Sequence, residues 1–339
     1  MTRVFSGIQP SGDLHLGNYL GALVNWVALQ DRADATYCIV DMHAITVEHD
    51  PAELRQRTVD MVTNLLAVGI DPSRATLFVQ SHVGDVHAEA TWLFNCITGF
   101  GELRKQPQFK EKADRIEAGD LKGQVSVGLF DYPVLQTADI ILYDAEEVPV
   151  GEDQRHHIEL ARNIAQRFNS RFCPEDDPLF VLPEAVHPAA AARVMDLQEP
   201  TTRMSKSASS DKGIVGVLDD PKRIAKKIRS AVTDSDAEVR HDRAAKPGVS
   251  NLIELHAAAT GRTIEQVEAE FAGQQYGALK SAVADAVVAL LEPVQARHAE
   301  LASDPGEVTR QLAAGAEKAR EVAAPKLARA KELVGFLLR

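Results

Sequence analysis

The first pattern in the chain is Arg3-Val4-Phe5-Ser6-Gly7-Ile8-Gln9-Pro10-Ser11-Gly12-Asp13-Leu14-His15-Leu16-Gly17-Asn18. Its apolar run Arg3–Ser6 predicts a β-strand, and the Gly, Pro and Ser residues that follow predict a turn. Apolar residues then recur at helical spacing over Leu16–Leu29, which predicts a helix. A strand, a turn and a helix in this order are typical of a parallel sheet covered by helices.

The rest of the first half repeats this alternation. Further strands are expected at Thr36–Val40, Thr76–Gln80 and Pro149–Val150. A helix is expected over residues 51–68, because Asp50 can cap it and proline suits its first position. The Lys- and Arg-rich region 100–124 shows no strand pattern and predicts a helical insertion.

Strand signals stop near residue 200. One helical face is shared by Leu279, Val283, Val287, Leu290 and Val294. Pro293 is expected to kink or end that helix, and Asp304 can cap a further helix that runs towards the C-terminus. The pattern therefore predicts an α/β half followed by an all-helical half.

The composition indicates a soluble globular protein and excludes several other classes. The 339 residues include 37 Lys and Arg against 49 Asp and Glu, a net charge of −12, with 45% hydrophobic residues. No apolar run reaches the ~18 residues of a membrane span, and the start lacks the apolar core of a signal peptide. Because Cys38, Cys96 and Cys173 form no cluster, we expect a cytoplasmic protein without disulfides or a metal site of its own.

The turn between Gly7 and Gly17 is the first candidate site. Backbone N–H groups at a glycine-rich turn before a helix favour a phosphate, and Gly17 would let a flat ring approach the backbone. His15 could donate hydrogen bonds to phosphate oxygens. The same glycines would also suit a tight turn without a ligand. The spacing is neither a Walker A loop nor a dinucleotide-binding fingerprint.

A second candidate site is Arg203-Met204-Ser205-Lys206-Ser207, which small polar residues flank on both sides. Such residues are typical of a loop, and alone this segment would be interpreted as solvated surface. Together, the His-x-Gly-Asn pattern at His15 and the Met-Ser-Lys-Ser pattern resemble the class I aminoacyl-tRNA synthetases. In that family the two segments close on ATP from opposite sides.

Further segments resemble the bacterial tryptophanyl-tRNA synthetases, in the same order and with similar spacing. They are Phe5–Gly12, His43–Thr46, Gly69–Pro72, Tyr132-Pro133, Ala138–Ile140, Val148–Gln154 and Ser230–Ser235. The resemblance implies an α/β, Rossmann-like catalytic domain over residues 1–200, with the helical insertion at about 100–124. It implies a signature loop and a helical domain that binds the tRNA anticodon over residues 201–339.

The resemblance also implies three sets of site residues. The tryptophan pocket would be formed by Phe5, Val40, His43, Tyr132, Gln136, Asp139, Val148, Val150 and Gln154. The ATP site would be formed by Gln9, Pro10, Ser11, Gly17, Asn18, Gly151, Glu152, Asp153, Val194, Met204, Ser205 and Ser207. The catalytic residues would be His15, Arg203 and Lys206.

The implied reaction joins tryptophan to tRNA(Trp) in two steps. Tryptophan and ATP, with Mg²⁺ bound through the ATP phosphates, form tryptophanyl-adenylate and pyrophosphate, and the amino acid then passes to the 3′ end of tRNA. Lys206 would meet the charge that grows on pyrophosphate. Asp139 would accept the indole N–H, so that a substrate without this donor leaves a buried carboxylate unpaired.

The resemblance further implies a homodimer and a tRNA partner. Two basic clusters could contact tRNA phosphates despite the acidic average: Lys222, Arg223, Lys226, Lys227 and Arg229, and Lys105, Lys110, Lys112 and Arg115. The chain departs from the family at Met42, Gln136 and Arg203, where relatives usually have Gln, Met and Lys. Two alternatives stay open: a tyrosine-specific relative, and a binding protein that senses tryptophan or a nucleotide.

Overall fold

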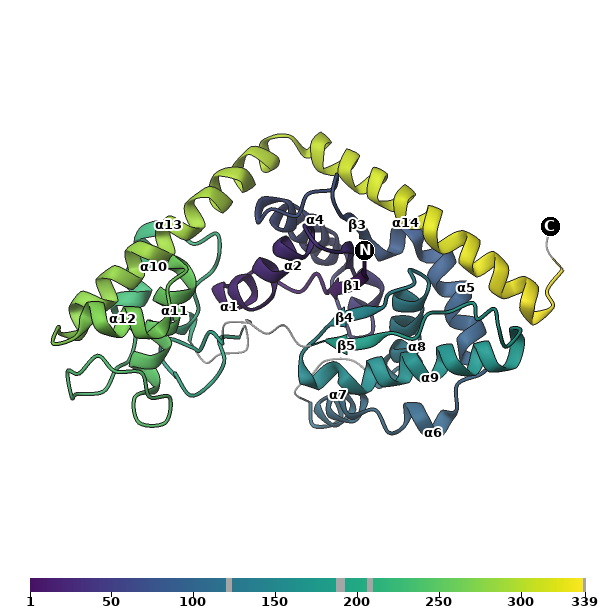
Figure 1. Cartoon of the computed structure of the whole chain (residues 1–339), viewed down its shortest axis with the longest axis horizontal. Coiled ribbons are helices and arrows are strands. Elements are labelled where there is room, and N and C mark those ends of the chain that lie inside the picture. The colour runs from purple at the N-terminus through teal and green to yellow at the C-terminus, as the bar shows by residue number, and fades with distance from the viewer. Residues whose placement is uncertain (120–123, 187–192, 206–209, 338–339) are drawn as a thin grey trace.

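The chain forms a five-stranded parallel sheet that helices cover on both faces (Figure 1). A computed structural model describes residues 1–119, 124–186, 193–205 and 210–337, except the side chains of Gln108 and Lys112. The strands are β1 (Arg3–Ile8), β2 (Asp34–Ile39), β3 (Thr76–Val79), β4 (Glu147–Pro149) and β5 (Glu184–Val186). Their order is β3-β2-β1-β4-β5. The α/β prediction is therefore confirmed.

The four predicted strands are confirmed, with small shifts at their ends, and β5 is new. Its residues Glu184-Ala185-Val186 carry no run of apolar or β-branched side chains, so the pattern does not reveal a strand there. It forms because the backbone of β4 pairs with it over three residues.

The helix predicted after the first turn is confirmed, but it is not uniform. It consists of α1 (Leu16–Asn18), a π-helical turn (Tyr19–Leu23) and α2 (Val24–Leu29). His15 caps α1, because its Nδ1 accepts the backbone N–H of Asn18 and the Asn18 side chain accepts the N–H of His15. A π-turn directly behind a capped helix start is a feature often found at functional sites.

The other helices of the α/β part are α3 (Asp41–Ala44), α4 (Pro51–Ala67), α5 (Gly84–Asn95), α8 (Val127–Ile141) and α9 (Arg155–Phe172). Short 3₁₀ turns cover Gln80–Val83 and Glu152–Gln154. Asp50 caps α4 as predicted, by accepting the N–H groups of Ala52 and Glu53. The predicted insertion is helical, with α6 (Phe100–Leu103) and α7 (Pro107–Glu117).

The second half is helical in the described residues. After a 3₁₀ turn at Asp211–Gly213 come α10 (Pro221–Arg229), α11 (Pro247–Thr260), α12 (Ile264–Phe271) and α13 (Tyr276–Ser303). The sequence predicted that Pro293 would kink or end its helix. It does not end it, since α13 continues to Ser303, and the kink stays a prediction. Proline removes one hydrogen bond to Ala289, and both residues lie on the exposed side, where water can satisfy the carbonyl.

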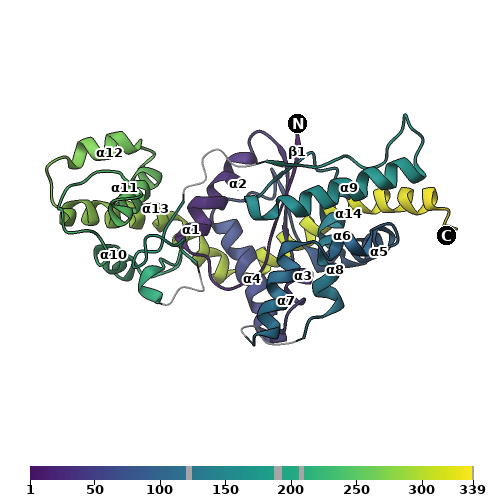
Figure 2. The same cartoon turned by 90° about the horizontal axis from the view of Figure 1, so that it is seen from below.

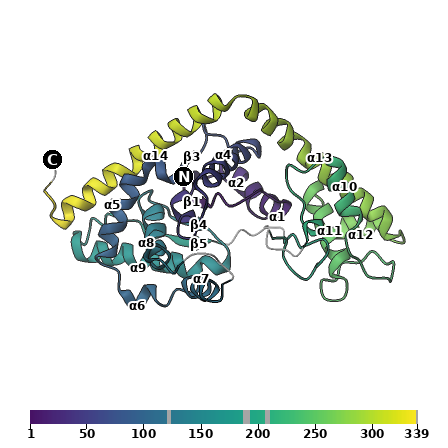
Figure 3. The same ribbon diagram turned by 180° about the vertical axis from the view of Figure 1, so that it is seen from behind.

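The last helix, α14 (Pro305–Val334), returns to the α/β part and lies against β3, the edge strand (Figures 1 and 3). Asp304 caps it as predicted. Gly315 makes the approach possible, because a Cβ there would lie 1.8 Å from the carbonyl oxygen of Leu77. Lys318 donates to the carbonyl of Pro72, and Arg320 pairs with Asp85. Seen from below, α14 extends along the whole α/β part (Figure 2).

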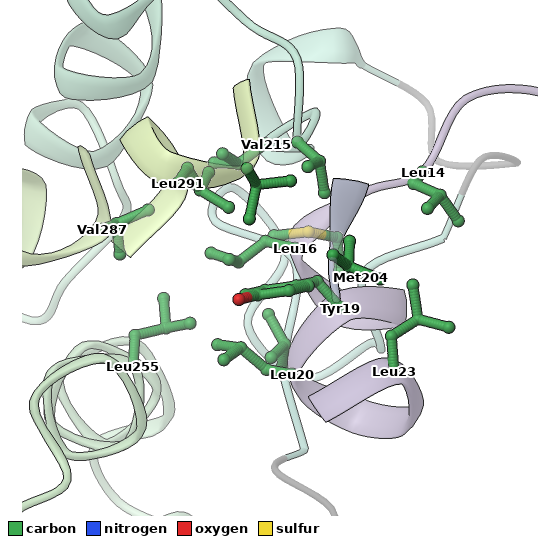
Figure 4. Packing of buried hydrophobic residues seen from close by; sticks show 14 of the residues in the cluster. Leu14, Leu16, Tyr19, Leu20, Leu23, Met204, Val215, Leu255, Val287 and Leu291 are labelled. Atoms are coloured by element: carbon green, nitrogen blue, oxygen red, sulfur yellow. The ribbon is translucent and has the colours of Figure 1, made fainter. Parts of the chain in front are cut away.

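One hydrophobic core joins the sheet to the helical half. Buried side chains from α1, the π-turn and α4 pack with those of α11 and α13. Figure 4 shows Met204 and Val215 among Leu16, Tyr19 and Leu20, with Val287 and Leu291 of α13 beside them. The second signature therefore begins inside this shared core, next to the first.

Candidate active site

A cavity of about 400 Å³ opens at the carboxyl ends of β1, β2 and β4. In a sheet of order β3-β2-β1-β4-β5 the strand order reverses between β1 and β4, which is where such folds bind ligands. The cavity is lined by all nine residues of the predicted tryptophan pocket, together with Ser6, Gly7, Gln9, Ile140, Pro149, Asp153 and His157. The structure thus brings together residues that lie far apart in the sequence.

Asp139, from α8, is the buried charge of this cavity, with only 1% of its surface exposed. Its Oδ2 accepts from His43 at 2.9 Å, and its Oδ1 accepts from His87 at 2.6 Å. The Gln80 amide nitrogen lies 2.7 and 2.8 Å from the two oxygens. Burial alone would raise the pKa of Asp139, but the hydrogen bonds from the two histidines outweigh it and hold the pKa at about 2. The carboxylate is therefore ionised.

A second polar chain crosses the cavity floor. The Tyr132 hydroxyl lies 3.0 Å from Nε2 of His157, and Nδ1 of His157 lies 2.8 Å from Oε1 of Gln154. Because an amide oxygen can only accept, Nδ1 of neutral His157 carries the proton and Nε2 accepts from the tyrosine. Burial, aided by the charge of Glu111, raises the pKa of Tyr132 to about 12, so its hydroxyl stays protonated.

The remaining walls are apolar. Phe5 and Val148 are almost fully buried, and Val40 is 9% exposed. Phe5 stacks on Tyr143 with ring centroids 5.6 Å apart, which fixes its position from behind. A flat aromatic ring with one polar donor fits a cavity that has apolar walls and a single buried carboxylate.

The first signature lies at the top of β1, beside this cavity. A Cβ on Gly17 would lie 2.9 Å from Nδ1 of His15 and 3.5 Å from the Cβ of Met204. His15 also pairs with Gly216, and the backbone of Leu16 donates to the carbonyl of Val215. The start of the first helix is therefore in direct contact with the segment that follows the second signature, and Gly17 lies close to Met204 within it.

The predicted ATP residues fall into three groups. Gln9 and Asp153 line the cavity itself. Pro10, Ser11 and Asn18 belong to the turn after β1 and the helix start, and Gly151 and Glu152 belong to the turn after β4. Val194 and Met204 are buried and paired, because the N–H of Met204 donates to the carbonyl of Val194. Ser205 is partly buried and follows Met204.

The structure tests the predicted catalytic residues only in part. His15 is buried at the helix start, and Arg203 is exposed, paired through its backbone with Met195. Lys206 and Ser207 lie outside the described residues. Their neighbour Ser205 follows Met204, whose side chain packs beside the first signature.

Four polar residues of the site were missed from the sequence. His157, Gln80, His87 and Tyr143 all take part in the two hydrogen-bonded chains. Gln80 could have been found, because a polar residue directly after a buried parallel strand lies at the binding edge of a sheet. His87 and Tyr143 each belong to the buried faces of helices or turns, where nothing in the local pattern separates them from core residues.

One basic cluster is partly structural. Lys227 is buried and pairs with Asp219 at 2.8 Å, with Asp211 at 3.4 Å, and donates to the carbonyl of Ile214. Arg223 pairs with Asp211 at 2.6 Å. The prediction that Lys227 contacts tRNA phosphates is therefore wrong, because its ammonium is buried and holds α10 to the loop before it.

Within 1–119, 124–186, 193–205 and 210–337, no group of three or more His, Cys, Asp or Glu side chains is arranged so that it could hold a metal ion. Among these same residues, no helix is long and apolar enough to span a bilayer.

Known proteins share this fold and this sequence over nearly the whole chain. The family model of class I tRNA synthetases for tryptophan and tyrosine matches residues 1–292. Tryptophan–tRNA ligase 2 of Streptomyces avermitilis is 51% identical over 336 residues, which cover 99% of this chain and 97% of that protein.

Two solved structures agree with this match. The tryptophanyl-tRNA synthetase of Mycoplasma pneumoniae is 35% identical with a TM-score of 0.85, over 99% of this chain and 98% of that one. That of Campylobacter jejuni, solved with ADP and tryptophan, is 32% identical with a TM-score of 0.82, over 99% and 100% of the two chains. The chain belongs to the class I tRNA synthetases of the tryptophan and tyrosine family.

Proposed function

We infer that this chain is a tryptophan–tRNA ligase. It activates L-tryptophan with ATP to tryptophanyl-adenylate and pyrophosphate, and then transfers tryptophan to the 3′ end of tRNA(Trp). The observation that carries this inference is the cavity at the sheet edge, where apolar walls surround the single buried carboxylate of Asp139. The full-length similarity to proteins named tryptophan–tRNA ligase supports the same activity.

Asp139 would recognise the indole ring. Of its three hydrogen-bond partners, His43 lines the cavity, whereas Gln80 and His87 are not among the lining residues. An entering indole N–H would therefore take the place of the His43 ring on Oδ2. Phe5, Val40, Val148 and Val150 would contact the faces and edges of the indole, and Gln136 lies one helical turn before Asp139 on the same wall.

Tyr132 and Gln154 would hold the α-ammonium group of the amino acid. Both line the cavity, and His157 joins them through two hydrogen bonds. The Gln154 amide also donates to Asp153 at 2.8 Å. An ammonium needs acceptors, which the tyrosine oxygen and the nearby Asp153 carboxylate can supply.

ATP would bind between the two signatures. The turn Gln9-Pro10-Ser11 and the helix start at Gly17 and Asn18 would contact the phosphates from one side. The turn Gly151–Asp153 and the segment Val194, Met204 and Ser205 would flank the ribose and base, with Ser207 near the phosphates. Only glycine fits at position 17 of this helix start, since a side chain there would collide with His15.

In the first step a carboxylate oxygen of tryptophan attacks the α-phosphorus of ATP, and the bond to pyrophosphate breaks. Lys206 would stabilise the charge on the departing pyrophosphate, with support from Arg203 and His15. Mg²⁺ would enter on the ATP phosphates and neutralise part of their charge. In the second step the terminal ribose hydroxyl of tRNA attacks the adenylate carbonyl, and AMP leaves.

The helical half would bind tRNA. We propose that residues 1–200 form the catalytic domain and residues 201–339 carry the signature loop and the anticodon-binding helices. Lys222 and Lys226 project from the exposed side of α10 and could contact phosphates. Such an enzyme would work in the cytoplasm.

A homodimer is the assembly that we propose. Three apolar side chains, Trp92 of α5, Phe100 of α6 and Val127 of α8, are 66%, 69% and 81% exposed. Trp92 also lines a groove of about 430 Å³ with Met42, Ile45, Leu135 and Tyr132. Tyr132 also lines the tryptophan cavity. A patch of this kind favours burial against a second copy.

Charging of purified tRNA with a panel of amino acids tests the function. We expect rapid, ATP-dependent charging of tRNA(Trp) with tryptophan and charging slower by at least ~10⁴-fold with tyrosine or phenylalanine, as sites that pair a substrate donor achieve. Faster charging with tyrosine would favour the tyrosine-specific alternative. Tryptophan binding without charging would favour the sensor.

A further inference from the structure

A buried hydrogen-bonded chain from Tyr143 through His87 to Asp139, here called the relay, supports Asp139 from the side away from the cavity. His87 from α5 and Gln80 from the turn after β3 are both completely buried. Nδ1 of His87 lies 2.6 Å from Oδ1 of Asp139, and Nε2 of His87 lies 2.7 Å from the hydroxyl of Tyr143. These residues belong to three different elements, so the contact is made by tertiary packing.

The chemistry of the relay fixes the direction of its protons. An ionised carboxylate can only accept, so Nδ1 of His87 donates to Asp139. In the neutral ring Nε2 is then the acceptor, and the Tyr143 hydroxyl is its donor. Burial, with the nearby Cys38 and Asp139, raises the pKa of Tyr143 well above its usual value, which keeps this hydroxyl protonated. The order of donation is therefore Tyr143 to His87 to Asp139.

The relay has no freedom to rotate. The Phe78 ring packs against both partners, with its centroid 6.0 Å from that of His87 and 5.4 Å from that of Tyr143. The Gln80 amide is oriented as well, because the backbone N–H of Met42 donates to its Oε1 at 3.1 Å. Its nitrogen must then face Asp139.

We propose that His87 is a positioning residue for amino-acid recognition, which, with Tyr143 behind it, holds the Asp139 carboxylate in the orientation that receives the indole N–H. The proposal rests on the role of Asp139 proposed above. His43 faces the cavity and can yield to the substrate, whereas His87 and Gln80 stay in place. A fixed, ionised acceptor strengthens the binding of a ring that carries a hydrogen-bond donor. A ring without a donor leaves the buried carboxylate without this hydrogen bond.

Two substitutions of His87 separate the effect of its hydrogen bond to Asp139 from the effect of its side-chain shape. The amide nitrogen of His87→Asn can occupy the place of Nδ1 and still donate to Asp139. The amide of His87→Gln reaches the place of Nε2, near Tyr143, and leaves Oδ1 without that donor. His82→Gln is the matched control, because His82 is exposed in the same turn region and has no contact with Asp139.

The readout is pyrophosphate exchange with tryptophan and with β-(3-benzothienyl)alanine, in which sulfur replaces the ring N–H. For His87→Gln we expect the KM for tryptophan to rise by at least ~10-fold, the scale of a lost donor to a buried charge. The kcat should change by less than ~3-fold, and the KM for the analogue should stay within ~3-fold. His87→Asn and His82→Gln should keep the tryptophan KM within ~3-fold of the parent enzyme.

Several results would overturn the proposal. Equal KM changes for both amino acids with His87→Gln would show a general structural effect, and a loss in His87→Asn as large as in His87→Gln would show that shape matters and the donor does not. If neither variant folds, Tyr143→Phe decides. We expect a rise of ~3-fold in the tryptophan KM alone, and an unchanged or equally changed pair of KM values contradicts the relay.

The parent enzyme distinguishes a failure of the His87 proposal from a failure of the proposed role of Asp139. If it uses tryptophan and the benzothienyl analogue equally well, the role of Asp139 fails. If it prefers tryptophan but the His87 and Tyr143 variants keep that preference, only the relay fails.

Discussion

Asp139 combines two properties that are seldom found in one side chain, complete burial and full ionisation. Three side chains donate to it, so the charge is stabilised in the absence of solvent. A neutral amide cannot satisfy this arrangement, because its NH₂ group would face donors.

Asp139→Asn should therefore impair recognition more than it impairs chemistry. We expect kcat/KM for tryptophan to fall by ~10- to 100-fold, as the loss of a hydrogen bond to a charged group implies, with most of the loss in KM. Steady-state pyrophosphate exchange measures this. Unchanged selectivity against phenylalanine would remove Asp139 from the pocket.

The same carboxylate gives a pH dependence of stability. The folded pKa is about 2 and the ordinary value is 3.8, so the folded state binds fewer protons than the unfolded chain between these values. The stabilisation is complete above about pH 5 and is lost as the pH falls towards 2. The difference in free energy of unfolding between the parent and Asp139→Asn should therefore shrink across this range, as urea unfolding at pH 5, 4 and 3 would measure. A difference in free energy of unfolding that stays constant from pH 5 to pH 3 would contradict the lowered pKa of Asp139.

Lys206→Ala should show the opposite kinetic pattern to Asp139→Asn. If the ammonium acts on the charge that develops in the transition state, kcat for adenylate formation should fall by ~10²- to 10³-fold, with the tryptophan KM within ~3-fold. Single-turnover adenylate formation measures the step. Equal losses in binding and rate would contradict the role.

At this scale the sequence predicted the residues that line the cavity but not those behind them. The cavity contains all nine predicted tryptophan residues, and the family pattern carried each of them. His87 and Tyr143 lie behind the cavity and bond to other side chains, and the cavity-lining His157 was missed as well. Their partners come from other elements, and only the folded chain brings them together.

Among the helices, α14 lies close to the backbone of β3 at Gly315. Gly315 lies where a Cβ would meet the carbonyl of Leu77 at 1.8 Å. We expect Gly315→Ala to lower the free energy of unfolding by ~1–3 kcal/mol, the scale of overpacking. Thermal unfolding measures it. Gly277→Ala in α13 is the control, because its added Cβ meets no atom within 4 Å, and it should be neutral or slightly stabilising.

Element prediction succeeded where local chemistry dominates. Caps at Asp50 and Asp304 marked two helix starts, since each carboxylate accepts backbone N–H groups of the first turn. It missed β5 and allowed a helix end at Pro293 that does not occur, because pairing with β4 and exposure to solvent decide these outcomes. Neither cause can be seen in a window of the sequence.

For the whole molecule, the exposed apolar surface at α5 and α8 predicts self-association. We expect Trp92→Asp and Val127→Asp to give monomers in analytical ultracentrifugation, because each would bury a charge in the dimer. Val322→Asp, at an exposed apolar position on α14, should leave the assembly unchanged. Because Tyr132 lines both surfaces, monomers should also have a tryptophan KM raised by ~10-fold. If the Trp92→Asp variant still forms dimers, the interface lies on another surface.

The contact between α14 and β3 has a consequence for synthesis. β3 emerges early from the ribosome, but the helix that covers its open edge is made after all the other described elements. Until then the nascent sheet presents unpaired backbone groups that can recruit another chain. Shielding of that strand by a chaperone during translation, and aggregation of chains that terminate before Gly315, follow from the order in which the polypeptide is made.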